Sequence, residues 1–325
     1  MKKVLFASTA LVATAGVAAA DVAVSGKAEM GIFGGTAIET QFFQDLDVTF
    51  NMSGTTDNGL TFGASIDLDE SWQGTNGAAP NGALANNADD GGASIFISGN
   101  FGTLTMGDTD GAMDWALTEA FNVGNPGSLG DEETSHTGAL GAYLDGDYDG
   151  QIVRYDNTFG DFGFAVSIEA DDTAPVRDLG YAVGVKYNLD LGGTTIALGV
   201  GHQRATYTVG AANVDGDITG ISATAKMAAG ISAGVTYSKF ENAGGVAVLD
   251  GNHVGVGVGY SMGAISLHAN YGKYDFDNNT EVKGYGVSAG YDLGGGLKLL
   301  AGYGNSEATG VASTDAYSVG ASMSF

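Results

Sequence analysis

Apolar and polar residues alternate with a period of two along most of the chain after residue 20. Between residues 44 and 52, Leu46, Val48 and Phe50 alternate with Asp45 and Asp47. Successive side chains of a strand point to opposite faces, so this pattern predicts strands with one apolar face. Sixteen such segments begin near residues 22, 41, 60, 92, 103, 150, 162, 179, 194, 217, 231, 252, 264, 282, 297 and 315, the weakest being those at 92 and 103. The chain is therefore predicted to be all-β.

Small residues on the face opposite the apolar one help to choose between two all-β folds. Alternation fits both a soluble sandwich and a membrane barrel, because each places one strand face in apolar surroundings. Glycine weakens a strand unless something needs the room, and a water-filled lumen does not have to be packed, which favours the barrel. The glycines of this face are Gly184, Gly199, Gly201, Gly255, Gly257, Gly286, Gly302 and Gly320.

The connections and the tyrosines also favour a barrel. Short turns such as 100–102 and 262–263 alternate with long polar stretches such as 71–91 and 241–251, the pattern of outer-membrane barrels. Tyrosines recur six residues apart on the apolar face; at ~3.3 Å per residue and ~45° tilt they lie about 15 Å apart in height, toward two aromatic girdles. These pairs are Tyr181/Tyr187 and Tyr285/Tyr291. We predict a 16-stranded antiparallel transmembrane β-barrel.

Residues 1–20 have the features of a secretory signal. Lys2 and Lys3 precede an apolar run over 4–17, and three alanines end at Ala20. The apolar run is shorter than the roughly 20 residues needed to span a bilayer, which disfavours a membrane anchor. We expect cleavage before Asp21 and a mature chain of 21–325. That chain has no uninterrupted apolar 18-mer, so no transmembrane helix is expected.

Composition narrows the possible partners. Cleavage takes Lys2 and Lys3 from the 12 basic residues, which leaves 10 beside 38 acidic ones and a net charge of −28. Such a charge disfavours nucleic acid and anionic surfaces as partners. With 44% hydrophobic residues the chain is not expected to be disordered, and without cysteine it must be stable without disulfides.

The alternation stops between residues 108 and 149. This stretch holds ten carboxylates and no Lys or Arg. A loop so long without secondary structure is uncommon in a compact fold and is usually functional or disordered. We predict that it folds into the barrel and narrows the channel.

Several segments resemble the alphaproteobacterial general porins. The resemblance lies in residues 52–65, 97–108 and 291–296 and in the terminal Phe325; it is strong at both ends and in the strands, and poor between 71 and 91 and between 171 and 251. It implies a homotrimer of 16-stranded barrels in the outer membrane of a Gram-negative cell, surrounded by lipid and open to small hydrophilic solutes and ions. It also implies a third outer loop, beginning near residues 107–108, that folds inward to form an eyelet.

The sequence departs from this family in its charges. The family typically carries arginines on the wall that faces the loop, but Asp45 and Asp47 occupy the inward positions of the second strand. The bases with inward parity are Lys27, Arg154, Lys186, Lys226 and Lys298. The loop carboxylates predicted to face this wall are Asp108, Asp110, Asp114 and Glu119. Carboxylates around a constriction attract cations and repel anions, so we predict cation selectivity.

A calcium site is a further hypothesis. Asp145, Asp147 and Asp149 match the first half of a calcium loop, with Asp156 at the twelfth position where Glu is usual. No flanking helices are expected, which disfavours an EF-hand and leaves a looser structural Ca²⁺ site. No other cofactor is expected.

Three other interpretations are disfavoured. A hydrolase needs a nucleophile and an oriented histidine, but no nucleophile motif accompanies His136, His202, His253 or His268, which we interpret as solvated polar side chains. The glycine-rich run 255–259 lies inside an alternating segment, so it predicts a strand rather than a phosphate loop. A secreted adhesin would explain the glycine and acidity but not the alternating connections or the terminal aromatic residue.

Overall fold

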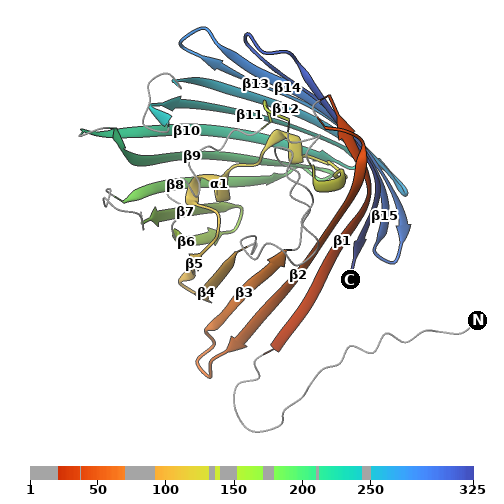
Figure 1. The fold of residues 1–325 in the computed structure, drawn as a ribbon. Coiled ribbons are helices and arrows are strands. Elements are labelled where there is room, and N and C mark those ends of the chain that lie inside the picture. The colour runs from red at the N-terminus through yellow and green to blue at the C-terminus, as the bar shows by residue number, and fades with distance from the viewer. Residues whose placement is uncertain are drawn as a thin grey trace, which may run out of the picture.

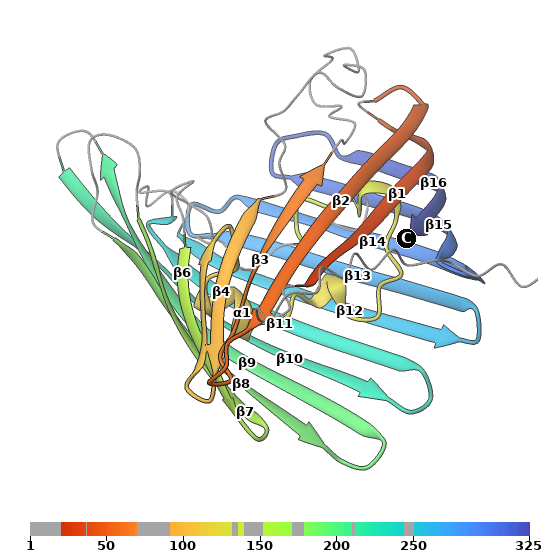
Figure 2. The same cartoon turned by 90° about the horizontal axis from the view of Figure 1, so that it is seen from below.

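Sixteen antiparallel strands close into one barrel. The computed structural model describes residues 21–36, 38–69, 92–131, 136–139, 152–170, 179–209, 212–243 and 250–325. Each strand pairs with its neighbours in chain order, and β1 pairs with β16 to close the ring. Figures 1 and 2 show the tilted strands from two directions. Closure gives every strand a partner on both sides, so no edge is left to pair with another chain.

The strands follow the predicted segments closely. Their bounds are β1 Asp21–Gly35, β2 Gln41–Thr55, β3 Thr61–Asp69, β4 Ala93–Gly99, β5 Gly102–Gly107, β6 Ile152–Phe159, β7 Phe162–Glu169, β8 Gly180–Asp190, β9 Thr194–Val209, β10 Ala212–Met227, β11 Ile231–Glu241, β12 Gly251–Met262, β13 Ile265–Phe276, β14 Glu281–Gly294, β15 Leu297–Ala308 and β16 Thr314–Ser324. The fold class is thus confirmed, and the run 255–259 lies within β12 as predicted.

The predicted start of β10 is wrong by five residues. Asn213 and Asp215 are residue types depleted in strands, which hid the beginning of this strand in the sequence. In the barrel they pair with Thr208 and Thr206 of β9, and the Thr206 hydroxyl donates to Asp215 Oδ1 at 3.0 Å. Cross-strand hydrogen bonds of this kind depend on the partner strand, which a single segment cannot reveal.

The outer face of the barrel is apolar, as the alternation predicts. Along β12, Val254, Val256 and Val258 are exposed, while the intervening residues are buried or glycine. The paired tyrosines of β8 and β14 point outward in the same way. A band of exposed aliphatic and aromatic side chains around a closed barrel is the surface that fits a bilayer.

The segment after β5 lies along the inner wall. It contains α1 (Ala112–Ala116), η1 (Ala120–Asn122) and η2 (Leu129–Asp131), so the expectation of a stretch without secondary structure is wrong. α1 packs on β6 to β9, η1 on β11 to β13, and η2 on β1, β15 and β16. Figure 1 shows α1 inside the ring of strands. Among the described residues, no helix is long and apolar enough to cross a membrane.

The inward glycines lie where this segment runs. A Cβ atom at Gly184, Gly199 or Gly257 would overlap with the backbone oxygens of Ala112, Ala116 and Ala120, respectively. At Gly234 and Gly290 it would lie 2.6 Å from Val123 and 2.7 Å from Pro126. The interpretation that Gly184, Gly199 and Gly257 face unpacked water is therefore wrong: at these three positions glycine is needed because another backbone approaches the wall.

Apolar contacts hold the two ends of the described segment. Met113 is fully buried within a cluster that includes Ile218 and Phe240, on the inner face of β10 and β11. Leu129 is also fully buried, against Phe33 and Phe43 of β1 and β2. The segment thus spans the inner wall from β6 to β1, fixed by a hydrophobic side chain near each end.

Replacing a wall glycine by alanine tests this packing. Gly184→Ala and Gly257→Ala should each lower the free energy of unfolding by about 1–3 kcal/mol, because the added methyl group forces the packed segment to move. The control is Gly99→Ala, where a Cβ would meet only the side chains of Leu60 and Phe101. It should be neutral or stabilising by about 0.5–1 kcal/mol. Urea unfolding of the three variants measures the difference, and equal midpoints for all three would contradict the packing.

Candidate functional site

The segment after β5 that lies along the inner wall (described residues 108–131 and 136–139) is called the inward segment. Arg154 of β6 fixes its start. Its Nη1 donates to the carbonyl oxygen of Asp110 at 2.6 Å and to the Thr109 hydroxyl at 3.4 Å. Its Nε pairs with Asp156 Oδ1 at 3.2 Å, and the side chain is only 11% exposed. Arg154 was predicted to be a wall charge of the constriction; its guanidinium binds a carboxylate and the backbone it supports.

Lys186 of β8 contacts the same part of the segment. Its Nζ lies 3.3 Å from the centroid of the Trp115 ring and donates to the Trp115 carbonyl oxygen at 3.3 Å. The ammonium therefore combines a cation–π contact with a hydrogen bond. The second predicted wall base is thus also engaged by the inward segment.

Asp114 lies on α1 close to these bases. Burial raises the pKa of its carboxyl above the ordinary value; the charge of Asp110 raises the pKa further, and Arg154 opposes both effects. Asp114 consequently loses its negative charge at a higher pH than an exposed aspartate. Asp108 is at the start of the segment, where its N–H donates to Ala93 at 2.9 Å, and Glu119 directly precedes η1.

A second group of charges lies on β1 to β3. Lys27 pairs with Glu29 at 3.1 Å, and Glu29, which is buried, accepts the N–H of Gly130 at 2.9 Å through its other oxygen. In the ladder Lys27 is opposite Asp47 and Glu29 is opposite Asp45. Glu29 thus holds η2 on β1, whereas Asp45 and Asp47 lie on the neighbouring strand β2, which is not among the strands on which α1, η1 and η2 mainly pack.

Asp67 of β3 extends this carboxylate-bearing wall. It accepts a hydrogen bond from Thr49 at 2.9 Å. Lys226 lies apart from both charge groups: it is exposed and faces Ser232 and Thr195 in the ladder at the turn end of β10. The predicted site residues therefore form two groups, around Arg154 and around Asp47, and leave out Lys226.

Hydroxyl groups of the wall complete the anchoring of the segment, and sequence reasoning missed them. Ser167 accepts the N–H of Ala112 at 2.8 Å, Ser222 that of Thr118 at 3.0 Å, and Ser318 that of Leu129 at 3.1 Å. The available signal was the inward parity of these serines on strands that also carry inward glycines, such as Gly163, Gly220 and Gly320. Ala112 and Leu129 are the first residues of α1 and η2, where a backbone N–H has no partner within the helix, and Thr118 follows α1.

Three of the four histidines are buried against the inward segment, so their interpretation as solvated side chains is wrong. His136 is 5% exposed, His253 0% and His268 4%. His202 differs: it faces outward from β9 and lies 2.9 Å from the Thr219 hydroxyl.

The calcium hypothesis falls largely outside the described part of the chain. Asp145, Asp147 and Asp149 do not belong to the described residues, and Asp156 pairs with Arg154. Within the described ranges, no cluster of three or more His, Asp or Glu side chains is suited to a metal.

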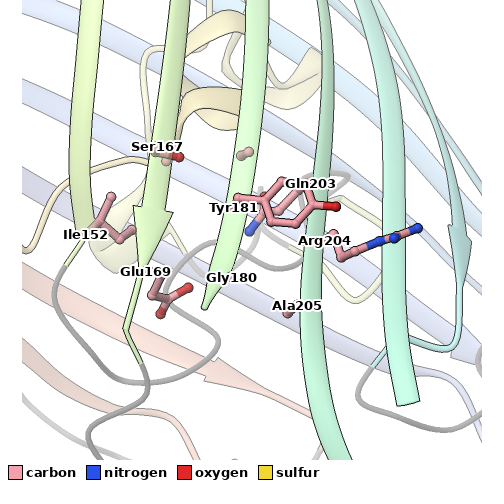
Figure 3. A pocket seen from close by; sticks show the side chains of 10 residues that line it. Ile152, Ser167, Glu169, Gly180, Tyr181, Gln203, Arg204 and Ala205 are labelled. Carbon is pink, nitrogen blue, oxygen red and sulfur yellow. The ribbon is translucent and has the colours of Figure 1, made fainter. Parts of the chain in front are cut away.

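A small, partly open space lies at the inner wall between β7 and β9. Figure 3 shows Ser167, Glu169 and Gln203 around it, and its volume is about 10 Å³. Gln203 Oε1 is buried there without a hydrogen-bond partner. The space suits one water molecule rather than a solute.

An apolar outer band, a polar interior and a segment packed inside a closed barrel define an outer-membrane channel. Residues 7–325 match the family model for Gram-negative porins, so the chain belongs to the Gram-negative porin family. It is 28% identical over 304 residues to a porin of Rhodobacter capsulatus, covering 87% of this chain and 93% of that one.

Solved porin structures share the fold. One, a porin refined at 1.8 Å resolution, has 25% identity and a TM-score of 0.72, with 94% of this chain and 100% of that chain covered. A mutant of the Rhodopseudomonas blastica porin has 18% identity and a TM-score of 0.67 over the same shares of both chains. The protein is thus a general diffusion porin of the outer membrane, from a family of channels rather than enzymes.

Proposed function

We propose that this porin selects for cations as small hydrophilic solutes and ions diffuse through it. The supporting observation is that the basic and the acidic side chains of the interior lie in different places and make different contacts. Arg154 and Lys186 bind the inward segment, whereas Asp45, Asp47 and Asp67 lie on a wall outside its main packing regions. Two of the inward bases are thus engaged by the segment, while Asp47 and Asp67 are half-buried on the inner face of β2 and β3.

The short distance across the passage makes these carboxylates effective on the ions inside it. A passage of ~10 Å is comparable to the Debye length of roughly 8 Å at physiological salt, so charges on opposite walls are incompletely screened. Asp108, Asp110, Asp114 and Glu119 on the segment and the aspartates of β2 and β3 then act on the same ions. The potential favours potassium over chloride, more strongly at low salt.

Reversing two wall charges tests the selectivity. Asp45→Arg with Asp47→Arg should lower the preference for potassium over chloride and leave the uptake of neutral sugars little changed. Reversal potentials across a salt gradient measure the preference. The matched control is Asp57→Arg with Asp161→Arg, which makes the same change in total charge in the short turns flanking β2 and β6.

Two results would count against this assignment. One is a wild-type channel that favours chloride. The other is a β2 double variant whose reversal potential shifts no more than that of the turn control, because net charge rather than position would then explain the effect.

We also propose that the mature protein is a homotrimer. The outward faces of the described strands β1 to β8 carry no Asp, Glu, Lys or Arg. On β9 to β15 the outer face carries ion pairs, including Arg204–Asp217 at 2.7 Å, Lys273–Glu281 at 2.8 Å and Lys283–Glu307 at 3.4 Å. The centre of a protein interface is depleted in charged residues, so the uncharged side suits contacts between copies.

Cleavage before Asp21 belongs to the same proposal. β1 begins at Asp21, which is consistent with a mature chain starting there. Mass spectrometry from mild detergent should give three copies of the chain, each lacking residues 1–20. A monomer under these conditions would contradict the trimer, and a subunit of full mass would contradict the cleavage.

A structural calcium ion held by Asp145, Asp147 and Asp149 remains a proposal. Removing a bound cation leaves like charges uncompensated, so EDTA should lower the thermal midpoint and added Ca²⁺ should restore it. Replacing the three aspartates by asparagine should abolish the response to EDTA. An identical midpoint with and without EDTA would rule out the site.

A further inference from the structure

A continuous chain of hydrogen bonds links the inward segment to β13 and back. The N–H of Gly138 donates to His136 Nδ1 at 3.1 Å, and His136 Nε2 lies 2.6 Å from Asn270 Oδ1. Asn270 Nδ2 lies 3.2 Å from His268 Nε2, and His268 Nδ1 lies 3.1 Å from the carbonyl oxygen of Val123. This series of hydrogen bonds starts and ends on backbone groups of the inward segment.

Those two ends fix the direction of every bond between them. A backbone N–H can only donate and a carbonyl can only accept. His136 must therefore accept at Nδ1 and donate from Nε2, and Asn270 must present its oxygen to His136 and its NH₂ group to His268. His268 must then accept at Nε2 and donate from Nδ1. Both imidazoles are consequently neutral, each in a single tautomer.

An added proton breaks this series of hydrogen bonds, whether it binds to His136 or to His268. Protonated His136 would turn an N–H toward the Gly138 N–H, and protonated His268 would turn one toward the NH₂ group of Asn270. Rotating the Asn270 amide does not help, because its NH₂ group would then meet the Nε2–H of His136. The network has no alternative arrangement that accepts the charge.

His253 adds a third ring to the same contact. It is fully buried on β12, its Nε2 lies 2.8 Å from the Gly138 carbonyl oxygen, and its Nδ1 has no hydrogen-bond partner. Since the carbonyl accepts, the neutral ring carries its proton on Nε2. A second proton on Nδ1 would be a buried charge without an acceptor, which is costly.

We propose that His136, His253 and His268 form a pH-sensitive latch that holds the inward segment against β12 and β13. Mild acid releases the segment toward the channel axis, and the protonated rings add positive charge to the interior. Both effects lower cation conductance. The inference rests on the proposed cation-conducting function and names a regulation of that channel.

Few other charges face the latch from the elements around it. Tyr274 of β13 contacts the His253 ring, with centroids 4.4 Å apart. Glu119 precedes η1, and Asp292 and Lys298 lie at the turn ends of β14 and β15. The three rings bond instead to uncharged groups, the Asn270 amide and the carbonyl oxygens of Gly138 and Val123, which do not compensate an added positive charge.

The sign of the pH effect follows from the neutral network. Burial lowers the pKa of His136 below its ordinary value, so the latched state binds protons less readily than the released one. Released histidines titrate near the ordinary pKa of about 6.5. Attachment is therefore complete above about pH 6.5 and weakens as the pH falls below it.

Single-channel recordings of the full-length porin in planar bilayers test the latch. Potassium conductance should fall at least about twofold from about pH 7.5 to about pH 5. His136→Asn should reduce this fall, and the triple variant H136N/H253N/H268N should remove most of it. His202→Asn is the matched control: it changes the fourth histidine, which faces outward, and should retain the wild-type response.

The outcomes separate the latch from the proposed function. A wild-type conductance that does not change with pH, or a triple variant that falls as steeply as wild type, would overturn the latch while leaving the channel intact. Absence of any cation-selective current at neutral pH would overturn the proposed function and the latch with it. If the triple variant does not insert into the bilayer, the single variants H136N and H268N are each compared with H202N in its place.

Discussion

The close approach of one backbone to another inside the barrel is the constraint on which the rest of this structure depends. An irregular segment enclosed by a sheet needs partners for its N–H and C=O groups, because the wall has already used its own backbone groups in the ladder. Inward side chains supply these partners: Ser167, Ser222, Ser318 and Glu29 accept, while His253 and His268 donate. Glycines along the same path let the segment come near enough for these bonds.

This anchoring also determines which charges remain for the solute. The two inward bases nearest the beginning of the segment, Arg154 and Lys186, hold the backbone of Asp110 and Trp115. Lys27 is drawn into a pair with Glu29, which itself holds η2 through Gly130. Asp45, Asp47 and Asp67 lie on β2 and β3, apart from these bases, and this arrangement connects the packing of the segment to the proposed ion selectivity.

The alternation pattern predicted the strands well because a strand in a barrel has one lipid face and one interior face along its whole length. It also placed Lys27, Asp47 and Arg154 correctly on the interior face. β10 began earlier than predicted because its first residues gain hydrogen bonds only from β9.

The path of the inward segment could not be predicted from local pattern. Its anchors join residues far apart in the chain, such as Thr118 with Ser222 and Leu129 with Ser318. The glycines were visible in the sequence, but period-two patterning does not distinguish a wall that faces water from one that carries another backbone. The burial of His253 and His268 was hidden for the same reason, since their partners include backbone groups of a distant segment.

The chain contains no cysteine, so a single engineered disulfide can test most directly whether the segment lies on this wall. In Val123→Cys with Gly234→Cys the two Cβ atoms would be 3.3 Å apart, close to the roughly 3.5–4.5 Å of natural disulfides. The pair should form a disulfide in intact outer membranes, whereas Val123→Cys with Ser65→Cys on β3 should not. Free thiols in the first pair, or cross-linking in the second, would contradict the placement of the segment on β11.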